Sequence, residues 1–177
     1  MSVMSVSMLE KSGNCPETLI DAVRRAVGRG AGWGQTAGLV AAVLRDNLPG
    51  TGILSADQLR GDPSGYQTHL VHAEADGSFS ITAMVWLPGQ QTPVHDHVSW
   101  CVTGVIQGAE HEEIFDTSLR VIARNTSPAG TVAGFAPPGD IHRVTNAGSG
   151  AAVSMHIYGA DISRLGSSIR REYTLPA

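Results

Sequence analysis

The sequence has few cysteines, a single lysine and no long hydrophobic run, and each absence excludes a class of protein. Its two cysteines, Cys15 and Cys101, provide neither a disulfide framework nor a CxxC zinc site. No basic cluster is longer than a pair and the net charge is −4, so neither nucleic acid nor an anionic membrane is indicated as a partner. No apolar stretch approaches the roughly 18 residues that a transmembrane helix needs.

The N-terminus lacks the basic region and apolar run of a signal peptide, so we expect a cytoplasmic protein. The chain has 177 residues, of which 42% are hydrophobic and 16% charged. This is a globular profile, and the length fits one domain with a sizeable core.

Helical patterns occur only near the start of the chain. Residues 16–30 begin with Pro16 at a first helical position, carry apolar residues at helical spacing and end in glycines. Residues 34–50 repeat that pattern and end at Pro49-Gly50, and a short helical turn is expected at residues 55–61.

From Tyr66 onward the segments are short, apolar and rich in β-branched residues, with turn-forming residues between most of them. Such closely spaced strands predict an all-β sandwich or barrel. We therefore expect one structural domain, in which a helical region (1–62) packs on a barrel (63–177). Residues 161–173 could form a last helix or an extended arm.

The stretch TPVHDHVSWCVTGVIQGAEHEE, residues 92–113, contains two histidines in an HxH pattern. On a strand, His95 and His97 point to one face and Asp96 to the other. A third histidine, His142, follows a Pro-Pro-Gly turn in PPGDIHRVTN, residues 137–146. Three imidazoles from two strands form a candidate metal site, whereas HxH alone could be a chance surface pair.

Two stretches resemble, in order, the two metal-binding motifs of the cupin fold. The first is the HxH pattern with Gly108 eleven residues after His97, and the second is PxGxxHxxxN from Pro137 to Asn146. The resemblance covers roughly residues 66–160. It implies a mainly β, single cupin barrel, a double-stranded β-helix or jelly roll, behind an N-terminal helical cap.

The usual first cupin motif carries a glutamate three or four residues after its second histidine, but no carboxylate follows His97 at that spacing. The stretch around the HxH pattern, which lacks this glutamate, and the later stretch HRVTNAGSGAAVSMHIYG together resemble the cysteine dioxygenase family of thiol dioxygenases. The resemblance implies one Fe(II) held by His95, His97 and His142. It also implies that O2 oxidises a small-molecule thiol to a sulfinic acid.

The string VSMHIYG places Ser154, His156 and Tyr158 on one face of a strand. In the resembled family an S-x-H-x-Y string forms a catalytic hydrogen-bonded relay; a purely structural polar ladder is the alternative. Cys101 lies where some family members join a cysteine to the tyrosine through a thioether. It could equally be a small buried apolar residue.

The substrate is less well defined. Family members hold the substrate carboxylate with an arginine two residues after a tyrosine; here Tyr66 is followed at that spacing by Thr68. A threonine cannot provide the bidentate contact of an arginine, so L-cysteine is not favoured. The substrate could be 3-mercaptopropionate, if Arg164 or a later arginine reaches the pocket, or another thiol such as ergothioneine.

Several other residues are given structural roles. His69 and His72 are expected on opposite faces of the first strand, and His111 in an exposed acidic turn. Asp140 is expected to form a turn. Asp96 is expected either to support a metal ligand from behind or to be a strand-edge partner, rather than to bind the metal itself. The alternative to a dioxygenase is a metal-binding cupin without oxygen chemistry, either an isomerase or a small-ligand binding protein.

Overall fold

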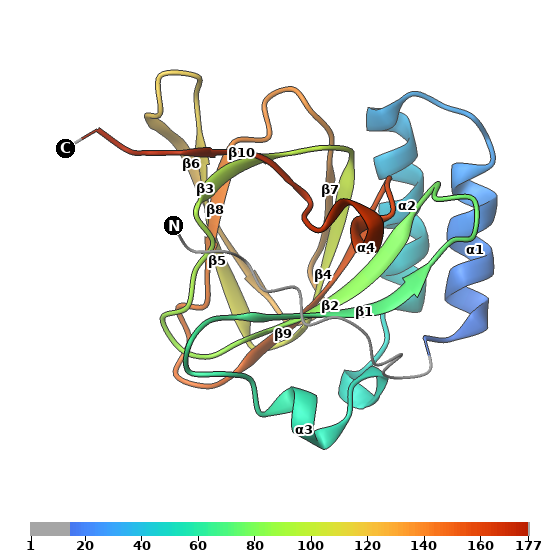
Figure 1. Ribbon diagram of the computed structural model, residues 1–177, viewed down its shortest axis with the longest axis horizontal. Helices are drawn as coiled ribbons and strands as arrows, with labels where there is room; N and C mark the ends of the chain where they lie inside the picture. The colour runs from blue at the N-terminus through green and yellow to red at the C-terminus, as the bar shows by residue number, and fades with distance from the viewer. Residues whose placement is uncertain (1–14, 177) are drawn as a thin grey trace.

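The computed structural model describes residues 15–176 as two facing β-sheets with helices against one of them (Figure 1). The first sheet has the order β1-β2-β9-β4-β7: β1 Gln67–Ala73, β2 Ser80–Trp86, β9 Ala152–Tyr158, β4 Cys101–Gln107 and β7 Val132–Phe135. The second has the order β10-β3-β8-β5-β6: β10 Ile169–Tyr173, β3 Val94–His97, β8 His142–Thr145, β5 Ala109–Phe115 and β6 Val121–Pro128. The helical elements are α1 Glu17–Val27, α2 Trp33–Asn47, the 3₁₀ turn η1 Thr51–Ile53, α3 Ala56–Leu59 and α4 Ile162–Leu165.

Helices α1 and α2 cover the outer face of the first sheet (Figure 1). α1 begins after Pro16, carries Glu17 in its first turn and arginines in its last, and so matches the helix dipole at both ends. α2 packs on β4 and β7. A Cβ atom at Gly104 would lie 2.6 Å from Leu48 Cδ1, and one at Gly134 would lie 2.9 Å from the Ala37 carbonyl oxygen. Glycine at these two strand positions is what allows α2 to approach the sheet.

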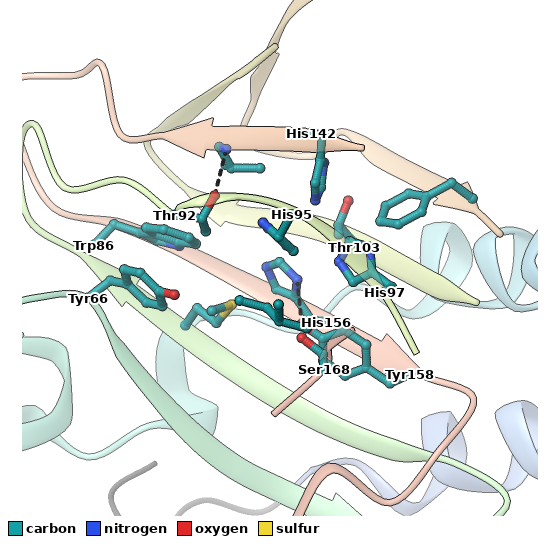
Figure 2. A pocket seen from close by; sticks show the side chains of 14 residues that line it. Tyr66, Trp86, Thr92, His95, His97, Thr103, His142, His156, Tyr158 and Ser168 are labelled. Atoms are coloured by element: carbon teal, nitrogen blue, oxygen red, sulfur yellow. Dashed lines mark hydrogen bonds between the residues drawn. The ribbon is translucent and has the colours of Figure 1, made fainter. Parts of the chain in front are cut away.

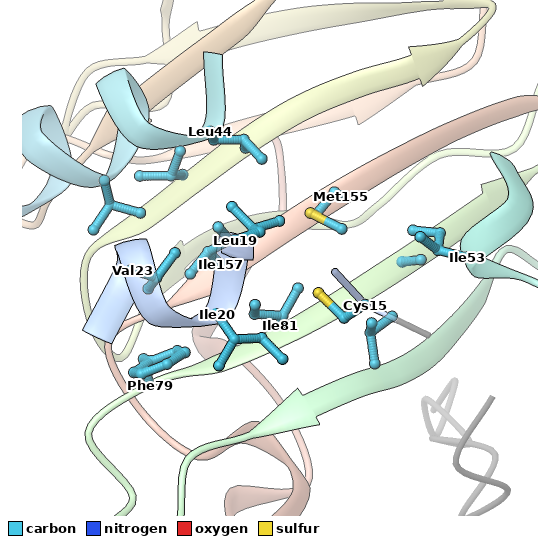
Figure 3. Packing of buried hydrophobic residues seen from close by; sticks show 14 of the residues in the cluster. Cys15, Leu19, Ile20, Val23, Leu44, Ile53, Phe79, Ile81, Met155 and Ile157 are labelled. Carbon is cyan, nitrogen blue, oxygen red and sulfur yellow. The ribbon is translucent and has the colours of Figure 1, made fainter. Parts of the chain in front are cut away.

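The main hydrophobic core lies between these helices and the first sheet (Figure 3). Leu19 and Leu44 of the helices meet Ile81, Met155 and Ile157 of the strands, all of them fully buried. Because side chains alternate along a strand, β9 turns Met155 and Ile157 outward to the helices. Val153 lies on the same outward face, whereas Ser154, His156 and Tyr158 point to the barrel interior, so the helical cap anchors the strand that carries these polar residues.

The prediction of a mainly β, double-sheet jelly roll with N-terminal helices is confirmed. The C-terminal segment forms both expected structures, a short helix (α4) and then a strand (β10) that pairs with β3. Within residues 15–176, the helices are too short or too polar to span a membrane.

Two local expectations are wrong. The acidic stretch around His111 is not a turn but part of β5, which pairs with both β6 and β8. His69 and His72 do not lie on opposite faces of β1, because the register shifts between Leu70 and His72. Both histidines therefore lie opposite residues of the helix-facing core, Ala83 and Ile81.

Candidate metal centre and catalytic relay

Three histidines meet inside the barrel (Figure 2). His95 and His97 share one face of β3, and His142 on β8 lies directly opposite His95 in the antiparallel register. The ligand atoms of the three residues all lie within 4.8 Å of one another, and all three side chains are buried. The HxH pattern and the downstream histidine thus form one cluster.

A hydrogen-bond acceptor lies beside the Nδ1 atom of each ring. His95 Nδ1 is 2.9 Å from the carbonyl oxygen of Pro93, His97 Nδ1 is 3.1 Å from Asp140 Oδ2, and His142 Nδ1 is 2.6 Å from Glu112 Oε1. A neutral imidazole that donates from Nδ1 keeps a lone pair on Nε2. These contacts favour the same tautomer in all three rings and leave Nε2 as the ligand atom.

The environment favours the uncharged form of two candidate ligands, His95 and His97. Burial, followed by the nearby His142 and His97 rings, holds the pKa of His95 well below its usual value. Burial also lowers the pKa of His97, although its hydrogen bond to Asp140 opposes that shift. Neutral imidazole is the form that binds a metal ion.

The cluster fits a divalent transition metal. Imidazole nitrogens suit zinc, copper, iron and nickel. Lone pairs held within 4.8 Å of one another repel each other, and a cation between them would remove that repulsion. Among the described residues the cluster contains no carboxylate ligand, so three histidines would leave further coordination positions open.

Asp140 does more than form a turn. Its Oδ2 atom accepts hydrogen bonds from both the backbone N–H of His97, at 2.9 Å, and the ring of the same residue. It therefore fixes the backbone and the imidazole of one candidate ligand. Asp96 points away from the cluster and binds Arg171 and Tyr173 of β10, which confirms the prediction of a strand-edge partner.

Two polar side chains of β9, His156 and Tyr158, line the pocket beside this cluster (Figure 2). Ser154 Oγ lies 2.9 Å from His156 Nε2, and His156 Nδ1 lies 3.3 Å from the Tyr158 hydroxyl. Trp86 donates its indole N–H to Ser154 at 3.1 Å. The three residues predicted to form a relay are thus hydrogen-bonded in sequence.

Burial sets the charge state of the relay. Burial, followed by the nearby His97 and His142 rings, lowers the pKa of His156 to about 3, so this ring is neutral at physiological pH. Burial raises the pKa of Tyr158 well above its usual value, so the phenol keeps its proton. The relay can hold or pass a proton without carrying a charge.

Cys101 lies directly opposite Tyr158 in the pairing of β4 with β9, and both residues are buried. Burial raises the pKa of the Cys101 thiol well above its usual value, and a hydrogen bond with Tyr158 partly opposes this. The pairing brings together the two residues of the expected thioether, which itself remains a prediction.

Aromatic side chains line much of the pocket around the histidines. Tyr66 stacks on Trp86 with ring centroids 4.5 Å apart, and Phe135 contacts the rings of two of the histidines. Thr68 and Arg164, the other two predicted substrate-binding residues, do not line this pocket. The Arg164 side chain is 68% exposed and pairs with Asp161. Among the described residues, the lining includes no arginine, lysine or carboxylate side chain.

Three supporting residues were not identified from the sequence: Glu112, Trp86 and, in its actual role, Asp140. Glu112 could have been found if residues 109–115 had been recognised as a strand next to His142, since alternation then turns Glu112 inward. No spacing rule points to Trp86, because its contact with Ser154 depends on the pairing of β2 with β9.

A double-sheet jelly roll with three inward-facing histidines from two neighbouring strands defines a cupin with a candidate metal site. Residues 58–167 match the model of the family described as cysteine dioxygenase type I. This match spans more than half of the chain, and the protein belongs to that family.

Three solved structures are similar to this chain, and the first of them supports the fold. A protein with a double-stranded β-helix domain from Klebsiella pneumoniae has a TM-score of 0.50 and 19% identity; the match covers 63% of this chain and 91% of that one. The protein TT1209 from Thermus thermophilus has a TM-score of 0.49 and 21% identity, over 61% and 96% of the two chains. An RmlC-like cupin protein from Desulfovibrio desulfuricans has a TM-score of 0.45 and 23% identity, over 59% and 92%.

Proposed function

We propose that this protein is an Fe(II)-dependent thiol dioxygenase that uses O2 to oxidise a small-molecule thiol to its sulfinic acid. The observation that carries the proposal is the three-histidine cluster of a cysteine dioxygenase family member, facing the Ser154–His156–Tyr158 relay. The cluster supplies ligands for a redox-active metal, and the relay supplies a hydroxyl group that can donate or accept a proton.

The charge of the ligand set favours a thiol substrate. Three neutral imidazoles leave the full 2+ charge of the metal uncompensated, whereas a carboxylate ligand would cancel part of it. When bound, Fe(II) would attract a thiolate and activate O2. The chain's own residues orient these reactants: Tyr158 lines the pocket together with the three histidines, and buried aromatic rings limit the access of water.

The composition of the pocket bears on which thiol is bound. A carboxylate substrate needs a cation or several donors to compensate for the loss of water. With no cationic side chain in the described lining and with Arg164 at the surface, L-cysteine and 3-mercaptopropionate lack an evident carboxylate partner. The face formed by Tyr66 and Trp86 instead suits a flat or cationic group. We infer a bulkier thiol or thione with a flat ring or a cationic group. Ergothioneine is a suitable test compound because its imidazole ring and trimethylammonium group match this face, although it also carries a carboxylate.

The second candidate is a metal-binding cupin without oxygenase activity, either an isomerase or a small-ligand binding protein. It is supported by the same three-histidine cluster, because such ligands also bind zinc and nickel. The relay is the observation that favours the oxygenase, since simple ligand binding does not require a hydrogen-bonded serine, histidine and tyrosine beside the metal.

Metal analysis combined with O2 consumption separates the two candidates. The purified protein should contain iron and consume O2 when cysteine, 3-mercaptopropionate or ergothioneine is added, with product mass increased by two oxygen atoms. His142→Ala should lose the metal, whereas His111→Ala on the neighbouring strand should retain it. Zinc or nickel content with no O2 consumption for any thiol would favour the second candidate.

A further inference from the structure

The strand that carries two of the three candidate ligands is short and depends on the C-terminal strand. β3 has four residues and pairs with β8 at one position, where His95 lies opposite His142. With β10 it pairs at four positions, and the backbone N–H of Val98 donates to the Ser168 carbonyl oxygen at 3.0 Å. β8, in contrast, pairs with β5 at four positions. The strand of His95 and His97 is therefore held in its sheet mainly by β10.

β10 is the edge strand of the second sheet, and β3 lies next to it (Figure 1). Without β10, β3 would itself be the edge, and its backbone groups on that side would face water. A short strand with exposed backbone hydrogen bonds opens at low cost in free energy. His95 and His97 would then move relative to His142, and a metal ion that needs all three nitrogens would bind less tightly.

A group of side chains fastens β10 to β3 on the face away from the histidines. Asp96 is 4% exposed, and its Oδ2 atom accepts hydrogen bonds from Arg171 Nε at 3.0 Å and from the Tyr173 hydroxyl at 3.1 Å. Arg171 Nη2 donates to the same oxygen, and the Arg171 guanidinium lies 5.6 Å from the centre of the Tyr173 ring. The Oδ1 atom is buried without a hydrogen-bond partner among the described residues. Within residues 15–176, the Asp96 carboxylate therefore depends on β10 for its hydrogen bonds.

The position of Asp96 between the two ligands makes this ion pair important for both of them. A buried carboxylate that loses its cation keeps the cost of desolvation and loses the attraction that compensated for it. It can recover hydration only by turning toward water, and that rotation moves the backbone to which His95 and His97 are attached. The ion pair thus acts on the ligands through the backbone, without touching the imidazole rings.

A bulge in β10 allows this strand to serve both faces of the sheet. The register shifts between Ile169, which lies opposite His97, and Arg171, which lies opposite Asp96, so Arg170 is the extra residue. Ile169 lines the pocket, whereas Arg171 binds Asp96 on the outer face. Without the extra residue, alternation would place Arg171 on the same face as Ile169.

We propose that Arg171 is a positioning residue of the candidate metal centre: through Asp96 it holds the strand of His95 and His97 in the geometry that a metal ion requires. β10 is thereby the clamp that completes the site. This inference rests on the three-histidine cluster of the proposed function, and not on the reaction. The cysteine dioxygenase match ends at residue 167, before β10, so the clamp follows from the contacts of this chain alone.

The coupling between the clamp and the metal works in both directions. If β10 raises the affinity of the histidines for a metal ion, the bound ion must stabilise the attachment of β10 by the same free energy. Ser168 and Ile169, where β10 begins, line the pocket. Metal binding should therefore also make this wall of the pocket more rigid.

Zinc binding tests the role of Arg171 without turnover. Chelator competition on the metal-free protein would measure the zinc affinity of the wild type, Arg171→Gln and Arg170→Gln. Loss of the ion pair should weaken zinc binding about tenfold, the lower end of the effect of removing a group that orients a ligand directly. Arg170→Gln is the matched control, because Arg170 is exposed and makes no ion pair or hydrogen bond through its side chain within residues 15–176. It should keep the wild-type affinity.

Further variants test whether Arg171 acts through Asp96. Arg171→Lys keeps the charge but not the two-point contact, and should recover part of the affinity. Arg171→Gln combined with Asp96→Asn should bind zinc no more weakly than Asp96→Asn alone, because the carboxylate that Arg171 compensates is gone. If Arg171→Gln does not fold, Tyr173→Phe removes one hydrogen bond to the same carboxylate and should weaken zinc binding in the same direction.

Hydrogen exchange measures the reciprocal effect on the clamp. Zinc should slow amide exchange of residues 167–173 in the wild type, and much less in Arg171→Gln. A purely structural role of Arg171 would lower the urea midpoint of the metal-free protein, but it would leave both the zinc affinity of the folded protein and this zinc-dependent protection unchanged.

Wild-type zinc affinity in folded Arg171→Gln would overturn the proposal, and so would an equal loss in Arg170→Gln or zinc protection that does not extend to residues 167–173. A wild-type protein that binds no zinc would contradict the clamp as well. A protein that oxidises no thiol but loses zinc affinity in Arg171→Gln would contradict the proposed function and leave the role of Arg171 supported.

Discussion

At the scale of single residues, the candidate metal site depends on the acceptors that lie behind the imidazole rings. Glu112 and Asp140 each bind the Nδ1 atom of a candidate ligand, and so fix both the tautomer and the orientation of the ring. Because these acceptors come from β5 and from the segment before β8, metal binding depends on the packing of the second sheet as well as on the ligands themselves.

Weakening such an acceptor should lower the affinity for the metal without removing a ligand. Glu112→Gln keeps an oxygen beside His142 but loses its charge, and we expect about a tenfold loss of metal affinity, approaching about 100-fold for Glu112→Ala. Chelator competition would measure both values. The same measurement on Glu113→Gln, which alters only the contacts with Arg124 and Arg143, should give the wild-type affinity.

Tyr158 lines the pocket together with the three histidines. Tyr158→Phe removes only the hydroxyl that bonds to His156, and leaves the packing of the ring nearly unchanged. A positioned proton donor or acceptor contributes about 10²–10⁴-fold, so turnover should fall within or somewhat below that range while the metal content stays intact. Wild-type turnover at saturating thiol and O2 would show that the ladder on β9 is only structural.

The pairing of Cys101 with Tyr158 gives an independent measurement on the same residue. If a thioether joins them, the mass of the intact protein should be about 2 Da below the sequence mass, because two hydrogens are lost. Cys101→Ala and Tyr158→Phe should each restore the sequence mass. If the wild-type protein has the full sequence mass, no thioether is present and Cys101 acts only as a small buried apolar residue.

At the scale of secondary-structure elements, alternation along β9 was predictable and places the relay on one face. The pairing of β5 was not predictable, because its acidic composition is typical of a turn and its inward-facing carboxylates are stabilised only by contacts with other elements. The bulge in β1 could not be predicted either. One extra residue reverses the faces of all later side chains, but it leaves the sequence pattern of the residues before it unchanged.

The approach of α2 to the first sheet can be tested with a pair of glycine substitutions. Gly134→Ala would place a methyl group 2.9 Å from the Ala37 carbonyl oxygen, and we expect a loss of about 1–3 kcal/mol in the free energy of unfolding. Gly38→Ala lies within α2, where nothing is found within 4 Å of the added Cβ, and should raise stability by about 0.5–1 kcal/mol. Urea denaturation of both variants would measure the difference, and equal stabilities would show that α2 does not pack as described.

At the scale of the whole molecule, the two sheets contribute different parts of one site. The second sheet provides the three histidines and the acceptors that orient them, and the first provides the relay with its helical support. The histidine spacing and the S-x-H-x-Y string could be read from the sequence. The contact of Trp86 with Ser154 could not, because it exists only where β2 pairs with β9.

Burying so many neutral histidines should make the metal-free protein sensitive to mild acid. The pKa values of His95, His97 and His156 are all lowered by burial from their usual value of 6.5, the last to about 3. The unfolded chain therefore binds more protons than the folded protein below about pH 6.5. The stability is complete above that value and is lost as the pH falls, by up to about 1.4 kcal/mol per pH unit for each such histidine.

Urea denaturation of the metal-free protein between about pH 7.5 and pH 5 should show this loss. His156→Gln should reduce the slope by about one proton's contribution, although the variant starts from a lower stability. Zinc at about 100 times its dissociation constant should add about 2.7 kcal/mol at the upper pH. That increment should shrink as the pH falls, because protons compete for the same imidazole nitrogens. A zinc increment that does not depend on pH, or that survives in His142→Ala, would mean that the ion binds outside the three-histidine cluster.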